Sequence, residues 1–486
     1  MKRLAAGLGV LGAMMVLPSP VAAHSLVGRL DTPLPLVVYL FGAGLAVALS
    51  FVFVILRNTH PAPAPRGKSV AVPRGVIVGL RALGLIAWLW IVTQTIVGGS
   101  SAADVSSLFL LVYGWVGLAI VSAFVGPVWV WLDPFTTIFD ILSAVGRRLG
   151  LGGSRHAAYP RWLSAWPAAV GMAFFVWIEL VYFGSLGMIL IAYTLITLAL
   201  MATFGRDTWR ANGETFSVWF GLLNRVARYA PSAEAQGKAV WRRPFAAGLL
   251  EPGWSTARLA VVAIGTGSIL YDGLSQTQLW FDLFGLPSMG VATLLLAGLL
   301  GIVVVIVLAV SRLVGVASVG AGLVPIAVGY LVAHYLTYLL GDGQRIIVAL
   351  SDPLQLGWDL FGTAFFEPSN DWLPASLVWT IMLASVVGGH VIGAWAGHSV
   401  AVREAPRHVN VRRRQAPLAA LMVALTVTTL WSLGQTIVQD QQASVSVHSA
   451  TAAVGRVDVR LLPRKNEGPA TVRGGASSLS STTEWR

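Results

Sequence analysis

The sequence predicts an all-α protein, a polytopic bundle of about ten transmembrane helices after a cleaved signal peptide. Of its 486 residues, 56% are hydrophobic and only 11% charged, whereas soluble globular proteins carry about a quarter charged residues. Apolar runs long enough to cross a bilayer as helices recur from end to end. The 52 glycines and 19 tryptophans are typical of closely packed helices with interfacial anchors. These observations argue against a soluble multidomain enzyme.

The first 23 residues have the pattern of a secretory signal peptide. Lys2 and Arg3 precede an apolar stretch over 4–17, and a small-residue cleavage site follows over 21–23. An uncleaved first span is the alternative, but the apolar stretch is short for a transmembrane helix. Cleavage after Ala23 leaves His24 as the mature N-terminus.

The next segment, 24–440, is expected to form the ten-span transmembrane domain. The predicted spans are 35–56, 76–98, 107–131, 163–184, 185–204, 256–275, 290–312, 319–340, 375–400 and 416–437.

Two connections and the tail are longer than turns. The cytoplasmic loop 205–255 contains an amphipathic stretch, 214–228, which we expect to lie along the inner interface. The extracytoplasmic loop 341–373 alternates apolar and acidic groups and is expected to cover the outer face. The tail 441–486 is rich in Ser, Thr, Gly and Arg, which is typical of a loosely ordered segment.

Charge predicts the orientation of the chain. The 33 basic and 21 acidic residues give a net charge of +12, and the basic residues gather in alternate short connections between the spans. This asymmetry predicts a bacterial inner-membrane protein whose mature N-terminus and C-terminal tail are extracytoplasmic. The expected partner is the lipid bilayer and not a nucleic acid, and the sequence identifies no protein partner.

Ionisable side chains within spans are costly and are therefore candidates for function. Glu179, Asp272 and His334 each lie a few residues from the outer end of their spans, within roughly 10 Å of the outer boundary. We expect them to share one site open to the extracytoplasmic side. His390 is expected to lie deeper, and His398 near the cytoplasmic face.

The chemistry of this site has three alternatives. Because the chain has no cysteine, a metal would be held by His, Asp, Glu, Met or backbone groups, and His334, His390, Asp272 and Glu179 suit zinc, iron or manganese. The same side chains could instead relay protons, or hydrogen bond between helices without further function. Separately, an N-terminal His24 could bind copper through its amine and imidazole.

Several stretches of the chain resemble one family. The stretches Ala23–Pro35, Gly126–Phe135, Trp177–Leu180, Tyr271–Leu274 and Ala333–Tyr335 are similar to a group of bacterial polytopic membrane proteins, many of which carry the name fenitrothion hydrolase. The resemblance covers nearly the whole mature chain. It implies hydrolysis of an organophosphate triester at the aryl–oxygen bond.

Three functions follow as expectations. The first is a metal-assisted hydrolase of small apolar phosphotriesters, with Glu179, Asp272 and His334 catalytic and water on the divalent ion attacking phosphorus. The second is a transporter that couples to protons or metal, or a metal-handling membrane protein. The third is a non-catalytic subunit of a membrane complex.

Overall fold

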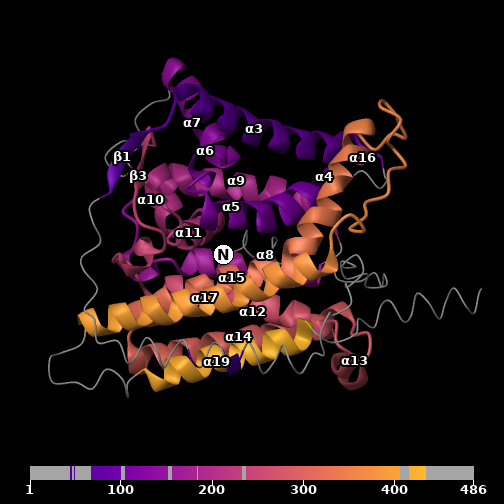
Figure 1. Ribbon diagram of the computed structural model, residues 1–486. Helices are drawn as coiled ribbons and strands as arrows, with labels where there is room; N and C mark the ends of the chain where they lie inside the picture. Colours follow the sequence, from indigo (N-terminus) through magenta and orange to yellow (C-terminus); the bar gives the residue numbers. More distant parts are fainter. Residues whose placement is uncertain are drawn as a thin grey trace, which may run out of the picture. The chain divides into compact units, whose positions relative to one another are not determined.

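The computed structural model describes residues 67–99, 104–150, 156–182, 184–232, 237–404 and 415–433, together with residues 44, 45 and 49 (Figure 1). The signal peptide, His24, nearly all of the first predicted span and the tail 441–486 lie outside these residues. Within them the fold is helical with three short strands, which confirms the predicted all-α class.

Eight helices among the described residues are long and apolar enough to cross a membrane, and each overlaps one predicted span. Five of them are single helices: α3 (Arg74–Val97), α9 (Leu186–Phe204), α12 (Thr256–Ser275), α14 (Met289–Val314) and α17 (Ala375–Glu404). The other three consist of consecutive segments. The first joins α4 (Val105–Ser107), η1 (Leu108–Gly117) and α5 (Leu118–Phe124), the second joins η2 (Arg161–Leu163) and α8 (Trp166–Leu180), and the third joins α15 (Val316–Gly341), η4 (Asp342–Arg345) and α16 (Ile346–Ser351). The last predicted span appears as α19 (Ala416–Leu433), whose apolar part is shorter.

The two most buried helices lie at the centre of the bundle. The apolar windows of the α15 and α12 spans are 89% and 83% buried, whereas that of α3 is 11% buried. An apolar helix that is buried on all sides shows little amphipathic periodicity, so the sequence alone could not tell which helices are central.

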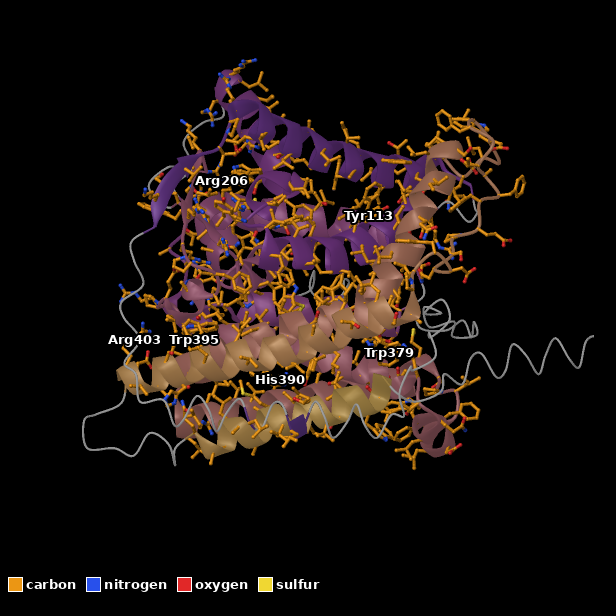
Figure 2. All side chains as sticks on the ribbon, in the orientation of Figure 1. Tyr113, Arg206, Trp379, His390, Trp395 and Arg403 are labelled. Atoms are coloured by element: carbon orange, nitrogen blue, oxygen red, sulfur yellow. The ribbon has the colours of Figure 1, made fainter. Side chains whose placement is uncertain are left out.

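The bundle has two distinguishable ends. At the acidic end, α12 and α15 finish and the loop with Asp342 and Asp352 begins. At the basic end, α9 and α17 finish close to Arg206 and Arg403, which Figure 2 shows on the left, opposite Trp379.

Small residues allow α15 and α17 to pack closely. A Cβ on Gly329 would lie 2.4 Å from the carbonyl oxygen of Ser385, and one on Gly393 would lie 2.4 Å from that of Gly322. Contacts of this kind bring backbones together in membrane bundles. They fix the position of α15, which carries His334.

The stretch 205–255 differs from the expected surface loop. It forms α10 (Arg206–Asn212), α11 (Thr215–Leu223), β2 (Tyr229–Pro231), β3 (Ala239–Arg242) and η3 (Ala247–Leu250). Strand β3 pairs antiparallel with both β2 and β1 (Lys68–Ala71). Most of α11 is buried within the protein, with Trp219 at 0% exposure, whereas a helix on a surface would leave one face uncovered. Its apolar side chains pack against α5, α8 and α12 instead.

The stretch after α15 is held by its own polar groups. The Asp352 carboxylate accepts hydrogen bonds from the backbone of Leu356 and Gly357, at 2.8 and 3.0 Å. The Trp90 indole and the Gln94 amide of α3 both donate to the carbonyl oxygen of Pro353, at 2.7 and 3.1 Å. Asp352 therefore stabilises the backbone of this loop, and Trp90 and Gln94 hold that backbone against α3.

Candidate functional site

His334 and Asp272 form a pair between the two central helices, with the imidazole buried and the carboxylate partly buried. The Nε2 atom of His334 on α15 lies 2.8 Å from Oδ2 of Asp272 on α12. The His334 side chain is 1% exposed and that of Asp272 is 14% exposed. Gln276, one turn further along α12, donates to the other Asp272 oxygen at 2.8 Å. Asp272 therefore links a buried imidazole to the acidic end of the bundle.

Glu179 on α8 joins the same region through α15. Its Oε1 accepts a hydrogen bond from the Tyr335 hydroxyl at 3.1 Å. The Tyr335 ring packs edge-on against the neighbouring His334 ring, with 4.6 Å between their centroids. The second carboxylate oxygen of Glu179 is buried and has no hydrogen-bond partner among the described residues. The three side chains predicted to lie at one level, Glu179, Asp272 and His334, are thus brought together.

His390 occupies a separate, fully buried position on α17. Its Nδ1 donates to the Val386 carbonyl at 2.7 Å, because a carbonyl oxygen can only accept. Its Nε2 lies 2.5 Å from the Thr426 hydroxyl of α19 and 3.5 Å from the Tyr330 hydroxyl of α15. The structure therefore does not bring His390 into direct contact with the His334–Asp272 pair.

The predicted metal ligands do not converge on one point among the described residues. No group of three or more His, Asp or Glu side chains that could hold an ion occurs in the described part of the chain. His334 uses Nε2 in its contact with Asp272, and Glu179 uses Oε1 with Tyr335. A zinc site needs three or four converging ligands. The assignment of these side chains as metal ligands stays a prediction of the sequence, and His24 lies outside the described residues.

A second buried polar cluster, which the sequence reasoning missed, lies toward the basic end. Asp133 precedes α7 (Pro134–Arg148), and its carboxylate accepts from the backbone of Phe135 and Thr136. Arg210 of α10 approaches this carboxylate to 3.3 Å. An Asp followed by Pro at the first helical position is a helix-start signal that could have indicated Asp133.

Glu214 completes this cluster at the start of α11. It is 0% exposed, and it accepts from Phe216 and Ser217 backbone N–H groups at 3.1 and 2.6 Å. The Tyr193 hydroxyl of α9 donates to it at 2.6 Å. Burial and the nearby Glu214 charge raise the pKa of Asp133 to about 6, although the Arg210 charge and the hydrogen bonds from Thr136 oppose this shift. These carboxylates hold the ends of short buried helices.

Fold and site together define a multi-pass helical membrane protein with ionisable groups buried between its central helices. Comparisons with family models, curated proteins and solved structures give no match.

Proposed function

We propose that this protein translocates protons across the membrane, and that the His334–Asp272 pair is the group that exchanges them. The observation that carries the proposal is the 2.8 Å contact between a buried imidazole and a carboxylate that reaches toward the acidic end. A histidine changes charge near neutral pH, and a carboxylate partner stabilises its charged form. Ionisable groups between transmembrane helices are common in proton pathways.

Further polar groups continue this pathway into the bundle. Tyr330, His334 and Tyr338 recur every four residues along α15, which places them on one face of the helix. Tyr330 leads to His390, and His390 to Thr426. In this proposal water spans the intervals between the side chains.

Toward the basic end, His398 lies two helical turns beyond His390, about 12 Å along α17. Its Nδ1 lies 2.8 Å from the Gln415 side-chain oxygen. Its Nε2 is buried without a hydrogen-bond partner among the described residues. His398 thus supplies a proton-accepting group in the last part of the pathway.

The hydroxyl of Thr426 shows how a proton could pass at His390. This hydroxyl has two acceptors in reach, the Met422 carbonyl at 2.7 Å and His390 Nε2 at 2.5 Å, but only one hydrogen to donate. When it donates to Met422, His390 Nε2 is free to accept from Tyr330 or to take a proton and donate to the Thr426 oxygen. In this proposal the exchange of these partners lets His390 take up and release a proton.

The proposal is tested by proton flux into proteoliposomes that contain a pH-sensitive dye. A potassium gradient with valinomycin sets a membrane potential that drives protons inward. We expect the wild type to acidify the lumen, and Asp272→Asn and His334→Gln to reduce the rate at least tenfold. Asp282→Asn is the matched control, because Asp282 is an exposed carboxylate on α13 (Gln278–Phe284), which directly follows α12. No flux with the wild type, or equal flux with all variants, would contradict the proposal.

A phosphotriester hydrolase, as the family resemblance implies, is the second candidate. One observation favours it: the Asp272 carboxylate holds the His334 ring, as an orienting carboxylate does for a histidine general base. Its test is release of the nitrophenol product from fenitrothion by the purified protein, with His334→Gln beside it. Metal content measured on the same samples tests the metal-assisted version.

A further inference from the structure

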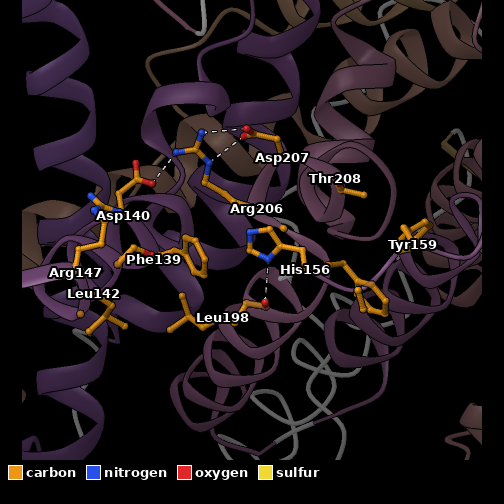
Figure 3. A pocket seen from close by; sticks show the side chains of 17 residues that line it. Phe139, Asp140, Leu142, Arg147, His156, Tyr159, Leu198, Arg206, Asp207 and Thr208 are labelled. Carbon is orange, nitrogen blue, oxygen red and sulfur yellow. Dashed lines mark hydrogen bonds and ion pairs between the residues drawn. The ribbon is translucent and has the colours of Figure 1, made fainter. Parts of the chain in front are cut away.

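A large pocket lies at the basic end, away from the His334–Asp272 pair. Its volume is about 1110 Å³, and it opens between α7, α9 and α10 (Figure 3). The lining residues on which the argument depends are Leu142, Arg147, His156, Leu198, Arg206 and Asp207.

The lining is divided into an apolar and a charged side. In Figure 3 the charged side chains Arg147, Arg206 and Asp207 lie along the upper and left side, and Leu142 and Leu198 lie below them. Leu198 belongs to the apolar span α9, whereas Arg206 and Asp207 follow directly after that span ends. A pocket at the end of a span, apolar toward the span and charged beyond it, matches the boundary between acyl chains and headgroups.

Ion pairs within the pocket hold Arg206 in place, whereas Arg147 takes part in none of them. Arg206 donates to Asp140 at 2.7 Å and to the two oxygens of Asp207 at 2.9 and 3.2 Å. Arg81 of α3 also contacts Asp140, so two guanidinium groups neutralise this carboxylate. Arg147 lines the pocket and is exposed, and no ion pair involves it among the described residues. Among the described lining residues, Arg147 is therefore the arginine that is able to take an external anion.

Helix α7 gives the pocket a membrane-facing wall. Four large aliphatic side chains on or directly after it are exposed, at 47–69%, and are best covered by lipid: Ile141, Leu142, Val145 and Leu149. Its last turn carries Arg147 and Arg148. A helix with an exposed apolar face and basic residues is typical of the membrane interface.

We propose that this pocket binds an anionic phospholipid, with the headgroup phosphate on Arg147 and the acyl chains along Leu142 and Leu198. The charge complementarity of Arg147 and the apolar wall select a ligand that has both a phosphate and hydrocarbon chains. His156 contributes a fixed polar surface, since its Nδ1 donates to the Ala202 carbonyl at 3.2 Å. Basic pockets between transmembrane helices are a known kind of anionic lipid site.

The test uses a matched pair of neighbouring arginines. Arg147 lines the pocket, whereas Arg148, in the same helical turn, does not. The wild type, Arg147→Gln and Arg148→Gln are purified in detergent, and phosphatidylglycerol is titrated while bound lipid is counted by native mass spectrometry. A zwitterionic lipid, phosphatidylcholine, is titrated in parallel. We expect Arg147→Gln to bind phosphatidylglycerol roughly fivefold more weakly, since a basic residue near anionic lipid contributes about 1 kcal/mol, and Arg148→Gln to match the wild type.

Two further outcomes decide the ligand class. Equal phosphatidylglycerol binding by all three proteins, or equal binding of phosphatidylcholine and phosphatidylglycerol by the wild type, would overturn the proposal. Inorganic phosphate is added as a competitor. Displacement of the lipid at millimolar phosphate would show that the pocket recognises a free anion rather than a lipid, which also overturns it.

Discussion

Gly389 of α17 lies against Pro325 of α15 so closely that a Cβ on Gly389 would be 2.5 Å from the Pro325 carbonyl oxygen. One residue away, a Cβ on Gly388 would meet no atom within 4 Å. The two adjacent glycines therefore have opposite tolerance for a side chain. The contact also fixes His390, the next residue on α17, beside α15.

Gly389→Ala is expected to destabilise the bundle, because the backbones of α15 and α17 would have to separate. Overpacking of this kind costs about 1–3 kcal/mol. The measurement is the thermal unfolding temperature in detergent, with Gly388→Ala as the control that should unfold like the wild type. Equal unfolding temperatures for the two variants would show that the helices are not in close contact here.

Glu214→Ala is expected to lower stability by about 2–4 kcal/mol. The change removes the acceptor for two backbone N–H groups at the start of α11, which costs about 1–2 kcal/mol. It also leaves the Tyr193 hydroxyl without its acceptor. Glu214→Gln retains one side-chain oxygen and should lose less. The unfolding temperatures of both variants check this order, and an Ala variant as stable as the Gln variant would contradict it.

Asp133 should make stability depend on pH. Its pKa is raised from 3.8 to about 6, so between these values the folded protein binds more protons than the unfolded chain. Stability therefore falls as pH rises from about 4 to 6, by up to about 3 kcal/mol, and this contribution is constant above pH 6. Asp133→Asn lacks the titrating carboxyl. We therefore expect the unfolding temperature of the variant, relative to that of the wild type, to increase as pH rises across this interval. Parallel pH profiles of the two proteins would contradict the raised pKa, and Asp282→Asn should follow the wild type.

Much of the fold was predictable because bilayer thickness sets the length of an apolar run. Each of the eight apolar helices overlaps a predicted span, and η1 adds a π-helical segment that the apolar pattern of Leu108–Gly117 does not distinguish from an α-helix. The burial of α11 was not predictable in the same way. Its polar flanks favour a surface helix, whereas the buried cap at Glu214 satisfies the helix start inside the protein.

The sequence predicted the depth of the three side chains along their helices but not the way the helices are rotated. Glu179, Asp272 and His334 each lie within seven residues of the end of their helix, at Leu180, Ser275 and Gly341. Their contacts run from Asp272 to His334 and from Tyr335 to Glu179; that they form one functional site stays a prediction. Hydropathy does not state which face of a fully buried helix meets which neighbour, so the contact of Tyr335 with Glu179 and the separate place of His390 needed the three-dimensional arrangement.

Thr426→Val should slow proton flux while the bundle stays folded. Valine has nearly the same shape but no hydroxyl, so His390 Nε2 loses its 2.5 Å partner. Thr428→Val is the control, because the Thr428 hydroxyl donates at 2.9 Å to the Ala424 carbonyl of its own helix. In the proteoliposome assay we expect at least a threefold slower rate for Thr426→Val and a wild-type rate for Thr428→Val. The two substitutions are chemically identical and lie two residues apart on α19. A similar rate for both variants would therefore place His390 outside the proton pathway. The His334–Asp272 pair is tested separately, by its own variants.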